Sequence, residues 1–514
     1  MGPDQPAAPA VIELRGIDKR FGDVHANRGI SLVVRRGTIH GIVGENGAGK
    51  STLMGILYGY YQPDRGEILV QGRPRTIRSA QDALAAGIGM VHQHFMLVEP
   101  FTVLENVVLG VEGGFRLRAG MTRARAELAH LAREYHLEVD PDARVADLGV
   151  GERQRVEILK ALARGATVLI LDEPTAVLTP KEADHLFRVL RSLRDEGKTV
   201  VLITHKLREI REVTDVVTVM RQGQVVATIP TAETTSEQIA ELMVGRVVNL
   251  RVDKAPATPG EPVLEVRDLV VADALGVERV KGVSFVVRRG EIVGIAGVAG
   301  NGQSELLEAI AGMRPVKSGR VTLKAHDLDR AVAGSPHAMR GLGVAHVPED
   351  RQRVGLVTSF AALESAILGY HDERGYNGPV LLRRAAVASS FERQAGEYDI
   401  RPGDGGLPTS AFSGGNQQKI VLARELTRHP DLLLIGQPTR GVDIGAIEFI
   451  HRRLVALRDA GKAMLLVSVE LDEILALADR ILVMHDGRIV GDVPRASASE
   501  RELGLMMAGV AEPS

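Results

Sequence analysis

The residues of this chain that are best suited to chemistry include a glycine-rich stretch. It lies after an apolar run and before a segment with a helical pattern. Gly44-Glu-Asn-Gly-Ala-Gly-Lys-Ser51 matches the phosphate-binding pattern G-x-x-x-x-G-K-[ST] in full. Its glycines let backbone N–H groups turn towards phosphates at the positive end of a helix. We expect Lys50 to reach the β- and γ-phosphates and the Ser51 hydroxyl to bind Mg²⁺. The expected nucleotide-binding residues here are Gly44, Glu45, Asn46, Gly47, Ala48, Gly49, Lys50, Ser51 and Thr52.

Two adjacent carboxylates follow a second apolar run, Val168-Leu-Ile-Leu-Asp-Glu-Pro174. At the end of a buried strand, Asp172 can hold Mg²⁺ directly or through water, and Glu173 can polarise an attacking water. A strand ending in an ordinary acidic turn is the alternative. The glycine-rich loop 121 residues earlier (172 − 51) makes that alternative much weaker.

Together with Leu202-Ile-Thr-His205, these two motifs resemble the ATPase domain of ABC transporters. The resemblance implies that His205 contacts the γ-phosphate and orients the water. It also implies that Gln93 touches Mg²⁺ or water and couples the site to a membrane partner. Phe21 matches the aromatic residue that stacks on adenine, with a core phenylalanine as the alternative.

His92 and His94 alternate in the manner of metal ligands. No carboxylate or further histidine lies near them in sequence, so we reject a metal site there.

The chain repeats itself, which identifies two homologous domains. Gly29-Ile-Ser-Leu-Val-Val-Arg-Arg-Gly37 recurs as Gly282-Val-Ser-Phe-Val-Val-Arg-Arg-Gly290, an offset of 253 (290 − 37) that grows to 264 (487 − 223) further on. About ten residues are therefore inserted in the second copy. We expect ATPase domains at 11–247 and 262–509, joined by a Pro/Gly-rich linker at 248–261.

Continuous apolar runs without polar alternation predict central strands of a parallel sheet that is covered on both faces. They lie at Thr38–Val43, Thr167–Leu171 and Thr199–Ile203. After a Gly-rich start, apolar residues recur at helical spacing, at Val156, Leu159 and Leu162/Ala163. The predicted fold class is α/β, twice. By resemblance, each domain is a P-loop ABC ATPase with a helical subdomain, and the two form a head-to-tail pseudo-dimer.

The second copy lacks the groups that hydrolysis requires. Its loop, Gly297-Val-Ala-Gly-Asn-Gly302-Gln303-Ser304, has glutamine in place of the lysine. Gly436 and Gln437 stand where the two carboxylates stood (436 − 172 = 264), and a neutral glutamine cannot take a proton from water near pH 7. Val469 replaces His205, and Glu349 replaces Gln93. No aromatic residue stands at the adenine position between Val271 and Val283.

The signature motif is intact in the second copy and defective in the first. Phe412-Ser-Gly-Gly-Asn-Gln417 keeps the ABC signature, whereas Leu148-Gly-Val-Gly-Glu152 lacks the serine. ABC dimers place each nucleotide between one P-loop and the other domain's signature. The resemblance therefore implies one whole composite site and one broken site, with random drift of a dying copy as the alternative. The whole site pairs Gly44–Ser51 with Ser413, Gly414 and Gly415, and the broken one pairs Gly297–Ser304 with Gly149 and Gly151.

Composition excludes several classes of protein. The 514 residues carry a formal net charge of −2, which disfavours a dedicated nucleic-acid binder. The absence of cysteine excludes disulfides, Fe–S clusters and thiolate zinc sites. No apolar run reaches the ~18 residues of a membrane span, and Met1–Ala10 lacks the features of a signal peptide.

The tandem layout, with Gln303-Ser-Glu and Gln437-Pro-Thr-Arg-Gly, resembles the motor subunits of bacterial monosaccharide and nucleoside importers. Val91-His-Gln-His-Phe-Met-Leu97 and Pro348-Glu-Asp-Arg351 favour the nucleoside branch. The resemblance implies ATP and Mg²⁺ as cofactors, two transmembrane permease subunits and, indirectly, a substrate-binding protein or lipoprotein. It places the chain at the cytoplasmic face of the plasma membrane, without nucleic acid.

Two other classes remain as alternatives. A soluble tandem ABC ATPase that acts on ribosomes would usually have two competent sites and a long charged linker. A DNA-repair ABC protein would need a coiled-coil or zinc insertion, and the chain has neither a heptad run nor a cysteine pair.

Overall fold

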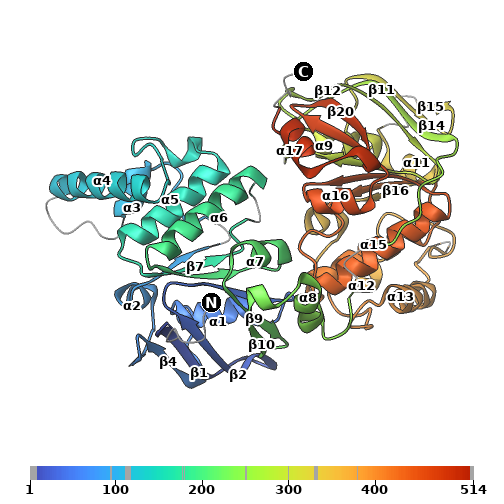
Figure 1. Ribbon diagram of the computed structural model, residues 1–514. Helices are drawn as coiled ribbons and strands as arrows, with labels where there is room; N and C mark the ends of the chain where they lie inside the picture. The colour runs from blue at the N-terminus through green and yellow to red at the C-terminus, as the bar shows by residue number, and fades with distance from the viewer. Residues whose placement is uncertain are drawn as a thin grey trace. The chain divides into compact units, whose positions relative to one another are not determined.

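The computed structural model describes residues 8–92, 95–109, 117–175, 178, 180–248, 252–298, 300–328, 334–378 and 380–509. The chain divides into two compact units, Met1–Val248 and Asn249–Ser514, each of which is described by itself (Figure 1).

The first unit combines a small antiparallel sheet, a larger mostly parallel sheet and flanking helices. Its strands are β1 (Ala10–Phe21), β2 (Val24–Arg35), β3 (Ile39–Gly44), β4 (Arg65–Val70), β5 (Arg73–Arg75), β6 (Ile88–Val91), β7 (Val168–Asp172), β8 (Thr199–Ile203), β9 (Val216–Arg221) and β10 (Gln224–Pro230). Its helices are α1 (Lys50–Leu57), α2 (Ala80–Ala85), α3 (Val103–Val108), α4 (Leu117–Glu134), α5 (Val150–Ala163), α6 (Pro180–Asp195), α7 (Leu207–Val213) and α8 (Ser236–Val244), with single turns at Val145–Asp147 and Thr231–Glu233.

The second unit repeats this plan. Its strands are β11 (Pro262–Ala272), β12 (Glu278–Arg288), β13 (Ile292–Ala296), β14 (Ser318–Leu323), β15 (His326–Asp327), β16 (Val344–Val347), β17 (Leu432–Gly436), β18 (Ala463–Ser468), β19 (Arg480–His485) and β20 (Arg488–Pro494). Its helices are α9 (Gln303–Ile310), α11 (Pro336–Gly341), α12 (Ala362–Ser365), α13 (Arg384–Tyr398), α14 (Gly414–Leu426), α15 (Ile444–Asp459), α16 (Leu471–Leu477) and α17 (Glu500–Met507), with short turns at Arg351–Gly355, Thr409–Ala411 and Arg495–Ser497.

The two units share one sheet topology. The larger sheets run β10-β9-β3-β8-β7-β6 and β20-β19-β13-β18-β17-β16, and the smaller ones β2-β1-β4-β5 and β12-β11-β14-β15. In the larger sheets, neighbouring strands pair in parallel except β10 with β9 and β20 with β19. The predicted α/β class is therefore confirmed for both copies.

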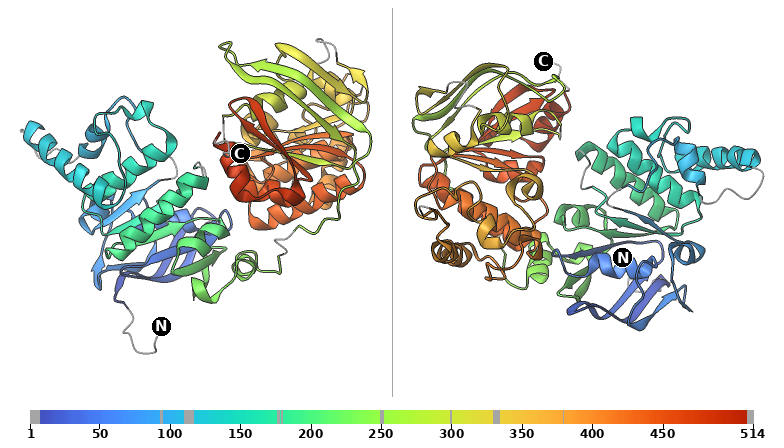
Figure 2. Two further views of the ribbon diagram at one scale, coloured as in Figure 1. Left: turned by 45° about the horizontal axis from the view of Figure 1, so that its top comes forward. Right: turned by 180° about the vertical axis from the view of Figure 1, so that it is seen from behind.

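Burial explains why the central strands are apolar throughout. Successive side chains of a strand point to opposite faces, and in β7 Leu169 and Leu171 join one core while Val168 and Ile170 join the other. The first core packs against α3–α6. The second packs against α1 and the antiparallel sheet. Figure 2 shows the same layers in each unit, with helices on both faces of the parallel sheet.

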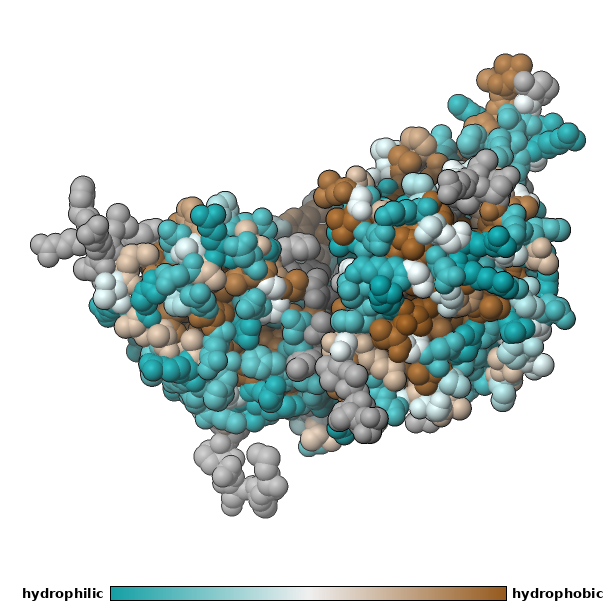
Figure 3. Space-filling model, turned by 90° about the horizontal axis from the view of Figure 1, so that it is seen from above, coloured by the Kyte–Doolittle hydropathy of each residue, from teal (hydrophilic) through white to brown (hydrophobic). Residues whose placement is uncertain are grey.

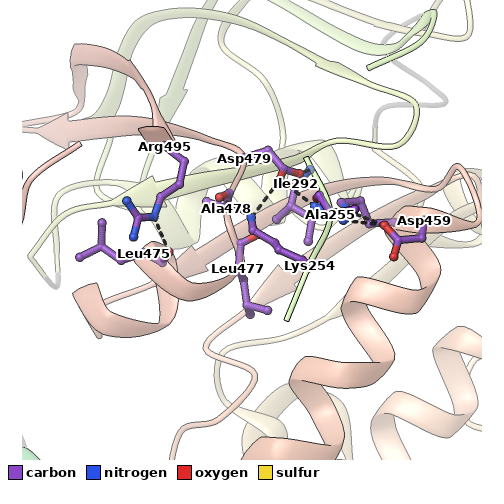
Figure 4. Close-up of polar contacts among 10 residues, drawn as sticks. Lys254, Ala255, Ile292, Asp459, Leu475, Leu477, Ala478, Asp479 and Arg495 are labelled. Atoms are coloured by element: carbon purple, nitrogen blue, oxygen red, sulfur yellow. Dashed lines mark hydrogen bonds and ion pairs between the residues drawn. The ribbon is translucent and has the colours of Figure 1, made fainter. Parts of the chain in front are cut away.

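The first described residues of the second unit, which follow residue 251, pack against the end of α16 in the same unit. Lys254 Nζ donates hydrogen bonds to the carbonyl oxygens of Leu477 and Ala478, both at 2.7 Å, and to Asp479 Oδ1 at 2.9 Å (Figure 4). Arg458 donates to the same carboxylate at 2.9 Å and to the carbonyl of Ala255. The negative C-terminal end of α16 favours the lysine, so this part of the expected linker is anchored rather than loose.

Among the described residues, no helix combines the length and apolarity that crossing a membrane requires. In Figure 3, hydrophilic and hydrophobic residues are intermixed on the visible face of each unit.

Candidate active site

The phosphate-binding loop of the first unit connects the end of β3 to the start of α1. Gly49 precedes Lys50 in the left-handed conformation, with φ 95°. A β-carbon at Gly49 would lie 2.3 Å from the carbonyl oxygen of Ala26, and one at Gly44 would lie 2.3 Å from that of Met220. Glycine is thus required at both ends of the loop, and the resulting turn leaves the N-terminus of α1 facing outwards for an anion.

Lys50 is folded into this loop. Its Nζ donates to the carbonyl oxygens of Gly44 at 2.7 Å and Glu45 at 3.1 Å. Burial lowers the pKa of Lys50, whereas the charges of Glu173 and Asp172 act in the opposite direction. The ammonium group is therefore held beside the carboxylate pair and at the loop, as a phosphate-binding lysine must be.

Asp172 is the last residue of β7, and its surroundings have an excess of negative charge. Burial, reinforced by the charge of Glu173 and opposed by Lys50, raises the pKa of Asp172 to about 6. At Asp172, burial and the charge of Glu173 outweigh the charge of Lys50, so this carboxylate lacks sufficient counter-charge. A divalent cation would supply it, and the exposed Ser51 hydroxyl at the start of α1 could be its second ligand. The residues present therefore fit Mg²⁺.

Glu173 is oriented by His205, which lies just beyond the neighbouring strand β8. The Nδ1 atom of His205 lies 2.9 Å from Oε1 of Glu173. Burial alone would raise the pKa of Glu173, but this hydrogen bond and the charges of His205, Lys50 and Lys206 lower it. The carboxylate therefore stays ionised and directed, which suits a group that must accept a proton from water.

Phe21 lies at the end of β1 and is 41% exposed, so it is not a core residue. Its ring packs edge-on against Tyr61 with the ring centroids 5.1 Å apart, and the Lys19 ammonium lies 5.5 Å from the Phe21 centroid. An accessible aromatic face is what stacking on a base requires. Stacking on adenine stays a prediction.

Gln93 and His94 lie outside the described residues. His92 is described, and its ring stacks on Tyr60 with the centroids 5.7 Å apart, while Tyr60 Oη lies 3.1 Å from its Nε2. His92 therefore contacts Tyr60 both by ring stacking and by a hydrogen bond.

The second unit keeps the backbone of this site with other side chains. Gln303 Nε2 donates to the carbonyl oxygen of Val298 at 3.1 Å, much as Lys50 donates to its own loop. Gln437 Oε1 accepts from the backbone N–H of Val469 at 3.3 Å, where the first unit has the Glu173–His205 pair. No side chain at these three positions can take a proton from water near pH 7.

Glu349 packs against Gly436, a contact that the repeat in the sequence does not reveal. A β-carbon at Gly436 would lie 2.5 Å from Cγ of Glu349, so the glutamate occupies the room that an aspartate would need there. Its Oε2 accepts a hydrogen bond from the Ser304 hydroxyl at 2.8 Å. From sequence, Glu349 is only a replacement for a glutamine, since its approach to Gly436 depends on tertiary packing.

The two signature segments begin their helices differently. Ser413 caps α14, because its Oγ accepts from the backbone N–H of Asn416 at 3.4 Å, and it also accepts from the Asn416 side-chain Nδ2 at 2.9 Å. A β-carbon at Gly414 would lie 2.7 Å from the carbonyl oxygen of Gly441, so that glycine allows close packing. Gly149 precedes α5 without a side-chain cap, and its N–H donates to Glu152 Oε2 at 3.0 Å. The hydroxyl is thus present in one signature only.

The comparison with protein families finds one family in both units. The family model described as "ABC transporter" matches residues 27–176 and 280–440, one stretch in each unit. The chain belongs to the ABC transporter family, whose ATP-binding domains it carries twice, and the expected tandem repeat is confirmed.

Three relatives match this chain over nearly all of its length. It is 46% identical over 503 residues to the nucleoside import ATP-binding protein NupA of Lactococcus lactis, covering 98% of this chain and 99% of that one. It is 47% identical to the guanosine import ATP-binding protein NupO of Bacillus subtilis, covering 97% of each. It is 45% identical to the glucose import ATP-binding protein TsgD13 of Haloferax volcanii, covering 97% and 96%.

Proposed function

We propose that this chain is the ATP-hydrolysing motor subunit of an ABC importer, with hydrolysis carried by the first unit. The observation that carries the proposal is the cluster of Lys50, Asp172, Glu173 and His205 around one glycine loop, in a chain similar over its whole length to import ATP-binding subunits. The ribosome-associated alternative gains no support from relatives with these names.

In this mechanism each side chain has one task. The loop N–H groups and Lys50 hold the β- and γ-phosphates, and Glu173, oriented by His205, accepts the proton of the attacking water. Ser51, Asp172 and Gln93 would hold Mg²⁺, which neutralises charge that develops on the phosphates. Phe21 would stack on the adenine.

We also propose that the hydrolytic site is completed by the signature of the second unit, Ser413–Gly415. The supporting observation is that the defects are complementary. The unit with Lys50 and Glu173 lacks the signature serine, and the unit with Ser413 lacks the lysine and the acid pair. A signature hydroxyl and the N-terminus of α14 would supply hydrogen bonds to the γ-phosphate.

The imported solute is proposed to be a nucleoside, with monosaccharides as the second candidate. Two relatives of 46% and 47% identity are named for nucleoside and guanosine import, and one of 45% for glucose import. The chain would act through two transmembrane permease subunits at the cytoplasmic face of the plasma membrane, with a separate substrate-binding protein or lipoprotein delivering the solute. No nucleic-acid partner is proposed.

Two measurements test this function. Expression with candidate neighbouring permeases, followed by pull-down in detergent, should recover a complex of this chain with two permease subunits. Deletion of the gene should abolish uptake of radiolabelled uridine or adenosine and leave ribose and galactose uptake unchanged. Loss of sugar uptake alone contradicts the nucleoside assignment, and recovery with ribosomes instead of any permease contradicts the importer.

A further inference from the structure

A cavity of about 540 Å³ lies in the second unit, where α13, α15 and the end of α14 meet. Arg393 and Gln394 line it from α13, Arg453 lines it from α15, and Leu426 and Thr427 line it from the end of α14. None of these side chains belongs to a phosphate loop or to a signature. A cavity of this volume is within the range that small-molecule ligands occupy in proteins.

Two buried polar atoms of residues that line this cavity lack a hydrogen-bond partner. Gln394 is 3% exposed, and its Oε1 accepts no hydrogen bond from any residue that the structure describes. The Nε atom of Arg453 is also buried and donates to no described group, although Nη2 of the same side chain pairs with Glu397 and Tyr398. Buried polar groups in proteins nearly always have a partner. Both side chains are therefore suited to bind a ligand that enters the cavity.

Arginine outnumbers glutamate among the described residues that line the cavity. Arg428 pairs with Glu373 at 2.8 Å, and Arg453 pairs with Glu397. Arg393 forms no ion pair within the described part of the chain. A guanidinium group binds phosphate and carboxylate groups through two parallel hydrogen bonds. The cavity therefore favours a ligand that carries an anionic group.

Helix α14 connects this cavity with the signature of the second unit. The helix begins next to Ser413, and its 13 residues end at Leu426 on the cavity. A helix of this length spans about 20 Å. Arg393 and Arg453 belong to the two other helices of the cavity and would hold a ligand across the end of α14. A bound ligand would therefore restrain the movement of Ser413 towards a nucleotide.

We propose that this cavity is a regulatory site for a small organic phosphate with hydroxyl groups, and that its binding slows ATP hydrolysis. The phosphate accepts hydrogen bonds from Arg393 and from Nε of Arg453, and a hydroxyl donates to Oε1 of Gln394. Phosphate esters of nucleosides and of monosaccharides share this chemistry. An uncharged nucleoside or sugar lacks the anion, so the cavity distinguishes a phosphorylated product from the transported molecule. Binding does not depend on the proposed ATPase function, whereas the effect on hydrolysis rests on it.

Isothermal titration calorimetry on the full chain measures the binding. A non-hydrolysable ATP analogue and Mg²⁺ are present throughout, so that the phosphate loops are occupied. Uridine 5′-monophosphate and ribose 5-phosphate represent the two classes of ester, and at least one of them should bind at one site per chain. Uridine should not bind, because it lacks the anion. Inorganic phosphate should bind more weakly than the ester, because it gains nothing from Gln394.

Arg393→Ala should weaken binding of the ester roughly tenfold or more, because it removes a charged hydrogen-bond donor. Gln394→Met keeps the length of the side chain and removes the amide, so it should weaken binding of the ester but not of inorganic phosphate. Since Oε1 of that amide has no described partner, Gln394→Met should not lower the thermal unfolding temperature. Arg384→Ala is the matched control. It removes the same charge from the same helix, outside the cavity, and should leave binding unchanged.

The ATPase rate of the assembled transporter gives the second readout. Saturating ester should lower the rate of the wild type and leave that of Arg393→Ala unchanged. The proposed site is wrong if neither ester shows saturable binding, if uridine binds as tightly as the ester, or if Arg393→Ala binds as the wild type does. Binding without an effect on hydrolysis overturns the regulatory role. Failure of the proposed ATPase function would look different, because the basal rate would be absent while calorimetry still reported binding.

Discussion

Glu173 and Gln437 occupy the same backbone position in the two units. Each follows the last residue of a parallel strand, with φ 47° and 48°. The N–H of Glu173 donates to the carbonyl of Ile203 at 2.9 Å, and that of Gln437 to Val467 at 2.8 Å. Since the scaffold is the same, the difference in chemistry between the units comes from the side chains.

Glu173→Gln should leave ATP binding intact and nearly abolish turnover. The variant keeps the size and the backbone position but removes the group that accepts a proton, a loss that typically costs ~10²–10⁴-fold. Steady-state ATPase and nucleotide binding of the assembled transporter measure the two effects separately. Gln437→Glu is the matched control. It should create no second activity, because Gln303 and Val469 stand in the second unit where Lys50 and His205 stand in the first. Turnover within a few-fold of wild type in Glu173→Gln would refute the assignment.

Lys254→Ala should destabilise the second unit and release residues 252–260 to proteases. Lys254 makes three hydrogen bonds from a partly buried position, and a hydrogen bond to a charged group contributes about 1.5–3 kcal/mol. Denaturant unfolding and limited proteolysis are the measurements. Lys317→Ala breaks only the surface pair with Glu278, at 2.7 Å, and should cost less than about 1 kcal/mol. Equal losses in both variants would mean that Lys254 does not anchor the segment.

Stability of the first unit should fall as the pH drops below about 6.5. His40 is 2% exposed, its Nε2 lies 2.7 Å from Thr218 Oγ1, and burial lowers its pKa to about 4. Between these pH values the unfolded chain binds a proton that the folded chain does not, so the stability lost reaches on the order of 3 kcal/mol by pH 4. His40→Gln should flatten this slope in urea unfolding, whereas the exposed His337→Gln should keep it. An unchanged slope in His40→Gln contradicts the prediction.

Motif spacing predicted most of the fold, and it selected Lys50, Glu173 and His205, which the structure brings close together. The apolar runs at Thr199–Ile203 and Thr167–Leu171 became β8 and β7, the second shifted by one residue, because burial on both faces leaves a continuous apolar pattern. Spacing could not show that Phe21 is exposed, that Lys254 binds the end of α16, or that Glu349 fills the space at Gly436. Each of these depends on contacts between segments far apart in the sequence, which no local pattern encodes.

Lys50 and Ser413 are 363 positions apart (413 − 50) and are proposed to serve one hydrolytic site. Lys50→Ala removes the cation at the phosphates, and Ser413→Arg places a bulky side chain at the signature. Phosphoryl transfer depends largely on positioning and electrostatics, so each change should reduce ATPase activity severely. Because residues that act as a unit are not additive, the double variant should be scarcely worse than either single one.

The mirror pair, Gln303→Ala and Gly149→Ala, is the matched control. A β-carbon at Gly149 would meet nothing closer than Glu152 Oε2 at 3.5 Å, so Gly149→Ala fits without strain. Both changes alter a site that already lacks the lysine, acids and histidine, and hydrolysis should change little. ATPase rates of the assembled transporter, with thermal unfolding to check the lost cap of α14 in Ser413→Arg, decide the matter. If Gln303→Ala is as damaging as Lys50→Ala, the division of labour between the sites is wrong. If Ser413→Arg is silent, the pairing of Lys50 with that signature is wrong instead.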